Sequence, residues 1–231
     1  LGIVLVKGMF GIKSMGVSGV GIATLVDRVL MMIAMMIFVF HSRYFKEYLK
    51  SFGWSAFDKL RCTKLLKIGA PVALQYTFEV GAFGGAAILV GTLGAVQQAA
   101  HQVAISLASM TYMMASGVST AATISAGHNY GKKNFTQLRL SAVSNYHIML
   151  VLMSTTALIF IILNKFLPWL YTSDESVIVI AAQLLIIAGF FQLFDGAQVV
   201  GLGILRGIGD VNIPTIITFI AYWIIGLPCG Y

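Results

Sequence analysis

Long apolar runs separated by short polar segments are the feature that most constrains how this chain folds. Five complete runs cover about 16–40, 65–91, 98–126, 137–164 and 177–205. A short apolar remnant lies at 1–10, and a further run extends from about 213 to the last residue. Because about 20 apolar residues cross a bilayer as an α-helix, each complete run predicts a membrane-spanning helix. The sequence therefore predicts an all-α polytopic membrane protein.

Composition supports the membrane class. Hydrophobic residues make up 58% of the chain and charged residues only 10%, whereas soluble domains carry roughly 25% charged residues. The net charge of +7 could suggest a nucleic-acid partner, but such proteins gather their basic residues on one face of a soluble fold. Here the basic residues occupy the gaps between apolar runs, so we expect a lipid bilayer as partner and no nucleic acid.

The distribution of Lys and Arg predicts the orientation in the membrane. One set of loops carries ten of them: Arg43, Lys46, Lys50, Lys59, Arg61, Lys64, Lys132, Lys133, Arg139 and Arg206. The opposite set carries three, Lys7, Lys13 and Lys165. Because cytoplasmic loops hold the excess of basic residues, segments 41–64, 127–139 and 206–212 are predicted to be cytoplasmic.

Two carboxylates, Glu79 and Asp195, stand in the middle of apolar runs. A charged side chain at that depth costs at least about 2.5–3.5 kcal/mol, which favours a role in cation or proton handling over a simple contact with a neighbouring helix. Gln75 lies one turn before Glu79, and Gln192 and Gln198 flank Asp195 three residues away on either side. Na⁺ needs several oxygen ligands, and a proton needs a carboxyl that titrates in the physiological range. The same residues suit both alternatives.

Aromatic side chains on the two runs that carry the acids are candidates for a substrate cavity. We select Tyr76, Phe83, Phe191 and Phe194, because aromatic faces bind organic cations through cation–π contact. Most aromatic residues of these runs must face lipid or other helices, so we expect two or three to contact substrate.

Other polar residues within the runs have more than one interpretation. Asp27 and Arg28 are adjacent in sequence and therefore do not face each other on a helix. We favour a structural contact between helices for them over transport. For His147, with Asn145 nearby, we favour packing.

Small residues predict how the helices pack. Gly81 with Gly85 and Gly203 with Gly207 form GxxxG pairs, which allow membrane helices to approach closely. Pro71 is expected near a helix start, where a missing N–H costs little.

Six segments, taken in order, resemble the multidrug and toxic compound extrusion (MATE) transporters. They are GMFGIKSMGVSGVGIAT, LKIGAPVALQYTFE, QQAAHQVA, SAGHNYGKKN, FQLFDGAQVVGLGILRGIGD and IAYWIIGLPCGY. The resemblance covers essentially the whole chain and implies a twelve-helix fold of two lobes that works by alternating access. It further implies an internal fragment, from the end of helix 5 to part of helix 11. Residues 1–40 would end the first lobe, 41–64 would be the cytoplasmic linker, and 65–231 would belong to the second lobe.

The resemblance also implies a function. Glu79 and Asp195 occupy motif positions of the NorM-like branch, where both belong to the second-lobe cation site, which would hold Na⁺ if the protein is sodium-coupled. The residue one turn before Asp195 is often tyrosine in that branch, and here it is Phe191. We expect a multidrug exporter of the inner (plasma) membrane, monomeric and not an enzyme, that exchanges Na⁺ or H⁺ for lipophilic organic cations and needs no other cofactor.

Two other functions remain as alternatives. A lipid-intermediate flippase of the same superfamily would want a basic cavity, yet the basic residues here belong mainly to loops. A membrane scaffold would have no use for two intramembrane acids. The sequence contains no HExxH, no GxSxG and no glycine-rich phosphate loop with GKS or GKT, which argues against ATP-driven transport.

Overall fold

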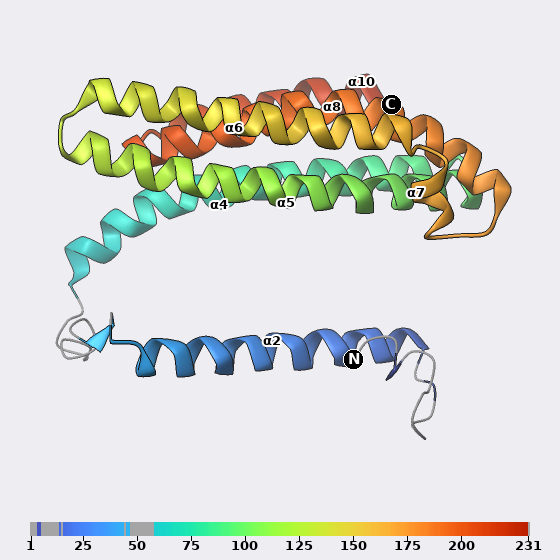
Figure 1. Ribbon diagram of the computed structural model, residues 1–231, viewed down its shortest axis with the longest axis horizontal. Helices are drawn as coiled ribbons and strands as arrows, with labels where there is room; N and C mark the ends of the chain where they lie inside the picture. Colours follow the sequence, from blue (N-terminus) through green and yellow to red (C-terminus); the bar gives the residue numbers. More distant parts are fainter. Residues whose placement is uncertain (1–3, 6–13, 15, 44, 47–57, 231) are drawn as a thin grey trace. The chain divides into compact units, whose positions relative to one another are not determined.

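The computed structural model describes residues 4–5, 14, 16–43, 45–46 and 58–230 (Figure 1). Every secondary-structure element assigned within these ranges is a helix. The chain divides into two compact units, Leu1–Cys62 and Thr63–Tyr231. The apolar remnant at 1–10, except residues 4–5, and the centre of the predicted linker, 47–57, lie outside the described residues.

In the described part of the first unit, residues Gly16–His41 form the long helix α2, which confirms the first complete apolar run as a helix. Most of its apolar side chains are exposed in this unit, as is typical of a helix that contacts lipid or other membrane helices. Asp27 and Arg28 are also exposed, and neither forms an ion pair with another described residue. The structural contact expected for them stays a prediction.

The second unit is a helical bundle. Its elements are α4 (Lys59–Gly91), α5 (Ala95–Gly131), α6 (Phe135–Ile162), α7 (Phe166–Trp169), α8 (Glu175–Ile208), α9 (Asn212–Phe219), the π-helical segment η2 (Ile220–Gly226) and α10 (Leu227–Gly230). The helices agree with the predicted apolar runs to within three residues, apart from α4 at its start and α5 at its end.

Five described helices are long and apolar enough to cross a membrane, and α5 is not among them. The run at 98–126 is nevertheless a helix of 37 residues. One face of α5 is buried from Ala100 to Ala126 and includes Thr111 and Ser119. Close packing of this face against neighbouring helices favours small residues, which contribute less to mean hydropathy than large apolar residues do.

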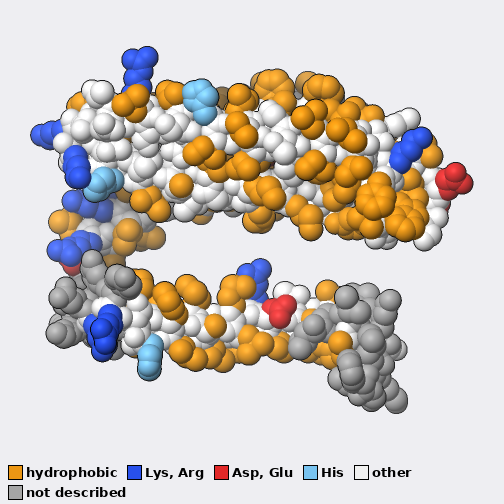
Figure 2. Space-filling model, viewed as in Figure 1, with side chains coloured by type: hydrophobic (Ala, Val, Ile, Leu, Met, Phe, Trp, Pro, Cys, Tyr) orange, Lys and Arg blue, Asp and Glu red, His pale blue; other side chains and the backbone are white. Residues whose placement is uncertain are grey.

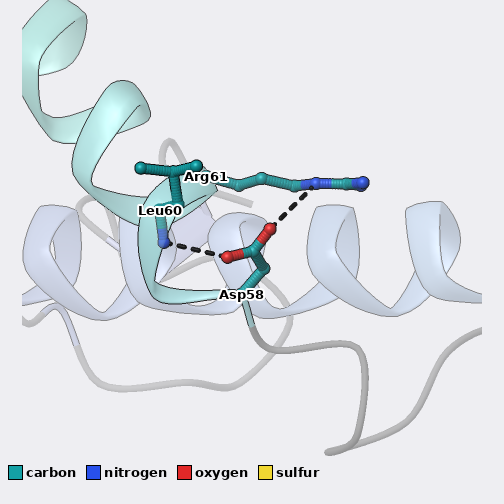
Figure 3. Close-up of polar contacts among 3 residues, drawn as sticks. All are labelled: Asp58, Leu60 and Arg61. Atoms are coloured by element: carbon teal, nitrogen blue, oxygen red, sulfur yellow. Dashed lines mark hydrogen bonds and ion pairs between the residues drawn. The ribbon is translucent and has the colours of Figure 1, made fainter.

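Helix α4 begins at Lys59, whereas the apolar run suggested a start near 65. The Asp58 side chain accepts a hydrogen bond from the backbone N–H of Leu60 at 2.9 Å and pairs with Arg61 at 3.2 Å (Figure 3). Asp58 thus caps the N-terminus of α4. The first two turns of this helix carry charged residues, so an apolar pattern does not reveal them. The expectation that Pro71 lies near a helix start is therefore wrong. Pro71 lies inside α4, where it removes one backbone hydrogen bond and favours a bend.

Helices α5 and α8 run parallel in very close contact. The Ser119 hydroxyl donates to the carbonyl of Val199 at 2.7 Å, and the Thr123 hydroxyl donates to that of Gly203 at 2.8 Å. A Cβ at Gly203 would clash with Ser119, and one at Gly207 would lie 2.5 Å from the Thr123 carbonyl oxygen. The second GxxxG pair therefore brings two backbones together.

The first GxxxG pair, Gly81 and Gly85, instead packs against large side chains. A Cβ at Gly81 would lie 3.1 Å from the Trp223 ring, and one at Gly85 would lie 3.1 Å from Leu227. The Trp223 indole N–H donates to the backbone carbonyl of Phe78 at 3.1 Å. These contacts fix η2 and α10 against α4.

The turns of the second unit lie at alternating ends of the bundle (Figure 1). The turns at 132–134 and 209–211 are at one end, which we call the basic end, and the segments 92–94 and 163–174 are at the other. Figure 2 shows Lys and Arg side chains gathered at the basic end and apolar side chains along the middle of the bundle. This is the distribution that the positive-inside rule describes, and the cytoplasmic position of the basic end remains a prediction.

Candidate functional site

A cavity of about 470 Å³ lies between α4, α5 and α8. We call it the Glu79–Asp195 cavity. Its lining residues are Tyr76, Glu79, Val80, Phe83, Ile105, Ala108, Ser109, Tyr112, Met113, Ser116, Phe191 and Asp195. Its volume is within the usual range for small-molecule sites, about 300–1,000 Å³.

The two acids come together in this cavity from different helices. Glu79 on α4 is 5% exposed and Asp195 on α8 is 9% exposed. Their charges interact electrostatically, and of the described residues that line the cavity none is Lys or Arg. Two carboxyl groups that share an apolar site attract a cation or share a proton, because like charges at short range are costly.

Three of the four selected aromatic residues, Tyr76, Phe83 and Phe191, line the cavity. The rings of Phe83 and Phe191 meet edge to face, with centroids 6.4 Å apart. Phe194 is not among the lining residues and is 77% exposed. Phe194 lies three residues after Phe191 and directly before Asp195. Consecutive side chains on a helix point about 100° apart, so Phe194 points away from the direction of the Asp195 side chain.

Tyr112 on α5 is a residue of the cavity that the sequence analysis missed. Its side chain lines the same cavity as Glu79 and interacts with the Glu79 carboxylate. The α5 lining also includes Ser109 and Ser116. Ser109, Tyr112 and Ser116 recur at spacings of three and four, which is the pattern of one helix face and the signal that could have found them. This face of α5 supplies hydroxyl groups to the cavity, whereas Phe191 has no hydroxyl group.

The three glutamines lie in three different surroundings. Gln75 bonds to Arg206 and to the backbone carbonyl of Val211. Gln192 is 3% exposed, and its amide has no hydrogen-bond partner among the described residues. Gln198 donates to the Tyr222 hydroxyl at 3.2 Å and lines a second cavity of about 260 Å³.

The separation of Gln192 and Gln198 has a geometric cause. Side chains three residues apart on a helix point in directions about 60° apart. Gln192 and Gln198 are six residues apart, so their side chains point about 120° apart around α8. None of the three glutamines lines the Glu79–Asp195 cavity. The supporting role predicted for the glutamines therefore requires that they act through neighbouring residues.

The remaining polar candidates bond within their own helices. The His147 ring nitrogen Nδ1 lies 2.8 Å from the carbonyl of Val143, and Asn145 donates to the carbonyl of Ser141 at 2.8 Å. Within the described ranges, no group of three or more His, Cys, Asp or Glu residues could hold a metal ion. A Na⁺ at the acids would therefore draw its other oxygen ligands from hydroxyls, carbonyls or water.

The family model for MatE matches residues 71–231, which are 161 of the 231 residues of the chain. The chain belongs to the MatE family. It is accordingly a multi-pass membrane transporter of the MATE superfamily, and the resemblance inferred from the six segments is confirmed at the level of the family. The matched region of this MATE protein contains both acids and every residue that lines the Glu79–Asp195 cavity.

Proposed function

We propose that this MATE protein is a NorM-like secondary exporter of lipophilic organic cations, driven by Na⁺ or H⁺ through alternating access. We further propose that it acts as a monomer in the inner (plasma) membrane and uses no cofactor other than the coupling ion. The observation that carries the proposal is the meeting of two buried acids, Glu79 and Asp195, in one apolar cavity.

The walls of the cavity suit an organic cation. Tyr76, Phe83, Tyr112 and Phe191 present aromatic rings to the same space as the two carboxylates. Aromatic faces bind cations more strongly where water is excluded, and the carboxylates supply the compensating charge. A pyrophosphate-linked lipid would instead need cationic side chains, so the lining argues against the flippase alternative.

Exchange follows from competition for one negative charge. A Na⁺ or proton that binds Asp195 or Glu79 neutralises the charge that holds the organic cation, and the drug is released. The coupling ion favours one orientation of the helices only if it binds that orientation more tightly. Because the ion and the drug use the same carboxylates, no covalent chemistry is needed.

Replacement of the aspartate tests this proposal. Asp195→Asn should abolish resistance of cells to cationic dyes while the protein is still expressed in the membrane. Asp210→Asn is a matched control, because Asp210 lies in the turn after α8 and does not line the cavity. Growth inhibition by a cationic dye, together with immunoblots of membrane fractions, gives the measurement. Full resistance in the Asp195→Asn strain would remove the aspartate from the mechanism.

A further inference from the structure

Arg206 lies against one end of the Glu79–Asp195 cavity. It belongs to the last turn of α8, and its Nη1 donates to the Tyr76 hydroxyl at 2.9 Å. Its Nη2 donates to Oε1 of Gln75 at 3.1 Å, and the centre of the guanidinium lies 4.8 Å from the centroid of the Tyr76 ring. One cation thus holds two consecutive side chains of α4.

The contacts extend to a third helix. The Gln75 amide donates to the carbonyl of Val211, just before α9, at 3.3 Å. The Thr215 hydroxyl of α9 donates to the carbonyl of Pro71 at 3.1 Å. We call the set of Arg206, Tyr76, Gln75 and Val211 the Arg206 network. It joins α4, α8 and α9 at the basic end of the bundle.

Tyr76 connects this network to the cavity. Among the α4 residues that line the cavity, Tyr76 is the one nearest the start of the helix, and so the one nearest the basic end. Arg206 reaches it because Cα–Cβ bonds tilt toward the N-terminus of a helix, which directs the side chain back from the end of α8. The positive charge therefore lies where the cavity approaches the basic end.

Arginine suits this position better than lysine would. The planar guanidinium group of arginine can donate hydrogen bonds in two directions while its face packs on an aromatic ring. Here it donates to Gln75 and Tyr76, which are adjacent, and also lies over the Tyr76 ring. Water can replace each of these hydrogen bonds when the helices part, so the net cost of breaking them is small. A contact of this kind can open and close during a transport cycle.

We propose that Arg206 is a positioning residue for transport. It fixes the Tyr76 ring in the wall of the cavity and keeps the cavity closed toward the basic end until α4 and α8 separate there. The role in transport rests on the proposed function of the cavity, whereas the closure itself does not depend on which cargo the cavity binds.

Access to the cavity from the basic end tests the closure. In the full protein with Cys62 and Cys229 replaced by serine, Ser116→Cys places one thiol in the cavity lining. A membrane-impermeant maleimide is then added on the side of the basic end, and the labelling rate is measured. R206Q should raise the rate roughly fivefold or more, as expected for the loss of about one net hydrogen bond. R139Q, which removes an exposed positive charge near the start of α6, should leave the rate unchanged.

Two further variants separate closure from a general loss of structure. Tyr76→Phe keeps the ring but removes the hydroxyl that accepts from Arg206, and it should raise the rate by less than R206Q does. Because both changes break one network, adding Tyr76→Phe to R206Q should change nothing more. R206K, which keeps the charge and one donor, should give a rate between those of the starting protein and R206Q.

Equal labelling rates in R206Q and R139Q would overturn the proposal, as would independent, multiplying effects of R206Q and Tyr76→Phe. The result is separable from the proposed function. If Asp195→Asn kept full dye resistance while R206Q still accelerated labelling, cation coupling at Asp195 would fail and closure by Arg206 would stand.

Discussion

Tyr112 gives the Glu79–Asp195 cavity a hydroxyl group next to an acid. The hydroxyl comes from α5 and interacts with Glu79, while Phe191, one turn before Asp195, offers only a phenyl ring. A hydroxyl beside a carboxylate can donate to it when it is charged and can serve as an oxygen ligand to Na⁺. At the scale of single residues, Tyr112 is therefore the strongest candidate to assist the two acids.

Tyr112→Phe should weaken the response to the coupling ion without removing it. A hydrogen bond to a charged group contributes about 1.5–3 kcal/mol, so the Na⁺ or H⁺ concentration needed for half-maximal dye efflux should change by roughly tenfold or more. The measurement is dye efflux from vesicles at graded Na⁺ and pH. Tyr146→Phe, in the lining of the second cavity, is the control. An unchanged ion dependence in Tyr112→Phe would exclude the hydroxyl from ion binding.

The two acids of the cavity were predictable from the sequence, but the residues around them were not. Glu79 and Asp195 were predictable because a charge in an apolar run is costly wherever the helix lies. Tyr112 was not, because a tyrosine in a helix becomes a site residue only through the neighbour it faces. Gln75 and Gln198 share helices with the acids, but the helices turn them toward Val211, Arg206 and Tyr222.

At the scale of helices, the contact between α5 and α8 supports one side of the cavity. Tyr112 and Asp195 are presented by these two helices, and further along both of them Ser119 and Thr123 bond directly to the α8 backbone. Small residues make this approach possible. Any side chain that separates the two helices should therefore disturb both stability and the cavity.

Gly203→Ala should destabilise the protein by about 1–3 kcal/mol, the usual cost of overpacking. The added Cβ would meet Ser119 and the backbone of α5. Gly117→Ala is the matched control, since a Cβ there meets nothing within 4 Å and alanine favours the helix. Thermal unfolding of the purified variants in detergent gives the comparison. Equal melting temperatures for both variants would show that α5 and α8 are not in close contact.

The start of α8 should respond to acid. Asp174 accepts hydrogen bonds from the Ser176 hydroxyl at 2.6 Å and the Ser176 backbone N–H at 3.0 Å, and these bonds lower the pKa of Asp174 below its usual 3.8. A lowered pKa in the folded state means that the contribution of this cap is present above pH 3.8 and is lost as the pH falls through the lowered value.

Amide hydrogen exchange at Ser176 and Val177 measures this effect. After correction for the intrinsic rate, protection at these amides should fall in the acid range in the unmodified protein. In Asp174→Asn, which caps a helix without titrating, protection should not depend on pH. Identical pH profiles for the two proteins would mean that Asp174 is not the cap.

The helices themselves were largely predictable, and their ends were less so. Apolar runs gave α2, α6 and α8 to within a few residues. The start of α4 was missed because its first turns are charged and are held by the Asp58 cap. Hydropathy alone leaves out α5, because its buried face consists mainly of alanines and also includes Thr111 and Ser119, and small residues of this kind contribute little to mean hydropathy.

At the scale of the whole molecule, the arrangement of the second unit combines three features. Its turns alternate between two ends, its basic residues gather at one of them, and its acids meet at the Glu79–Asp195 cavity. The Arg206 network lies between that cavity and the basic end. This is an arrangement in which cargo and coupling ion can share one site while access to it is controlled from one side.

The most direct test of cation-coupled exchange is competition at the cavity. Tetraphenylphosphonium binding to the purified protein is measured while Na⁺ or H⁺ is raised at constant ionic strength. If the coupling ion and the drug share the two carboxylates, one of these ions should displace the bound probe from the unmodified protein, and Asp195→Asn should lose both binding and displacement. Binding and ion-driven displacement in Asp195→Asn that equal those of the unmodified protein would contradict this shared use of the carboxylates.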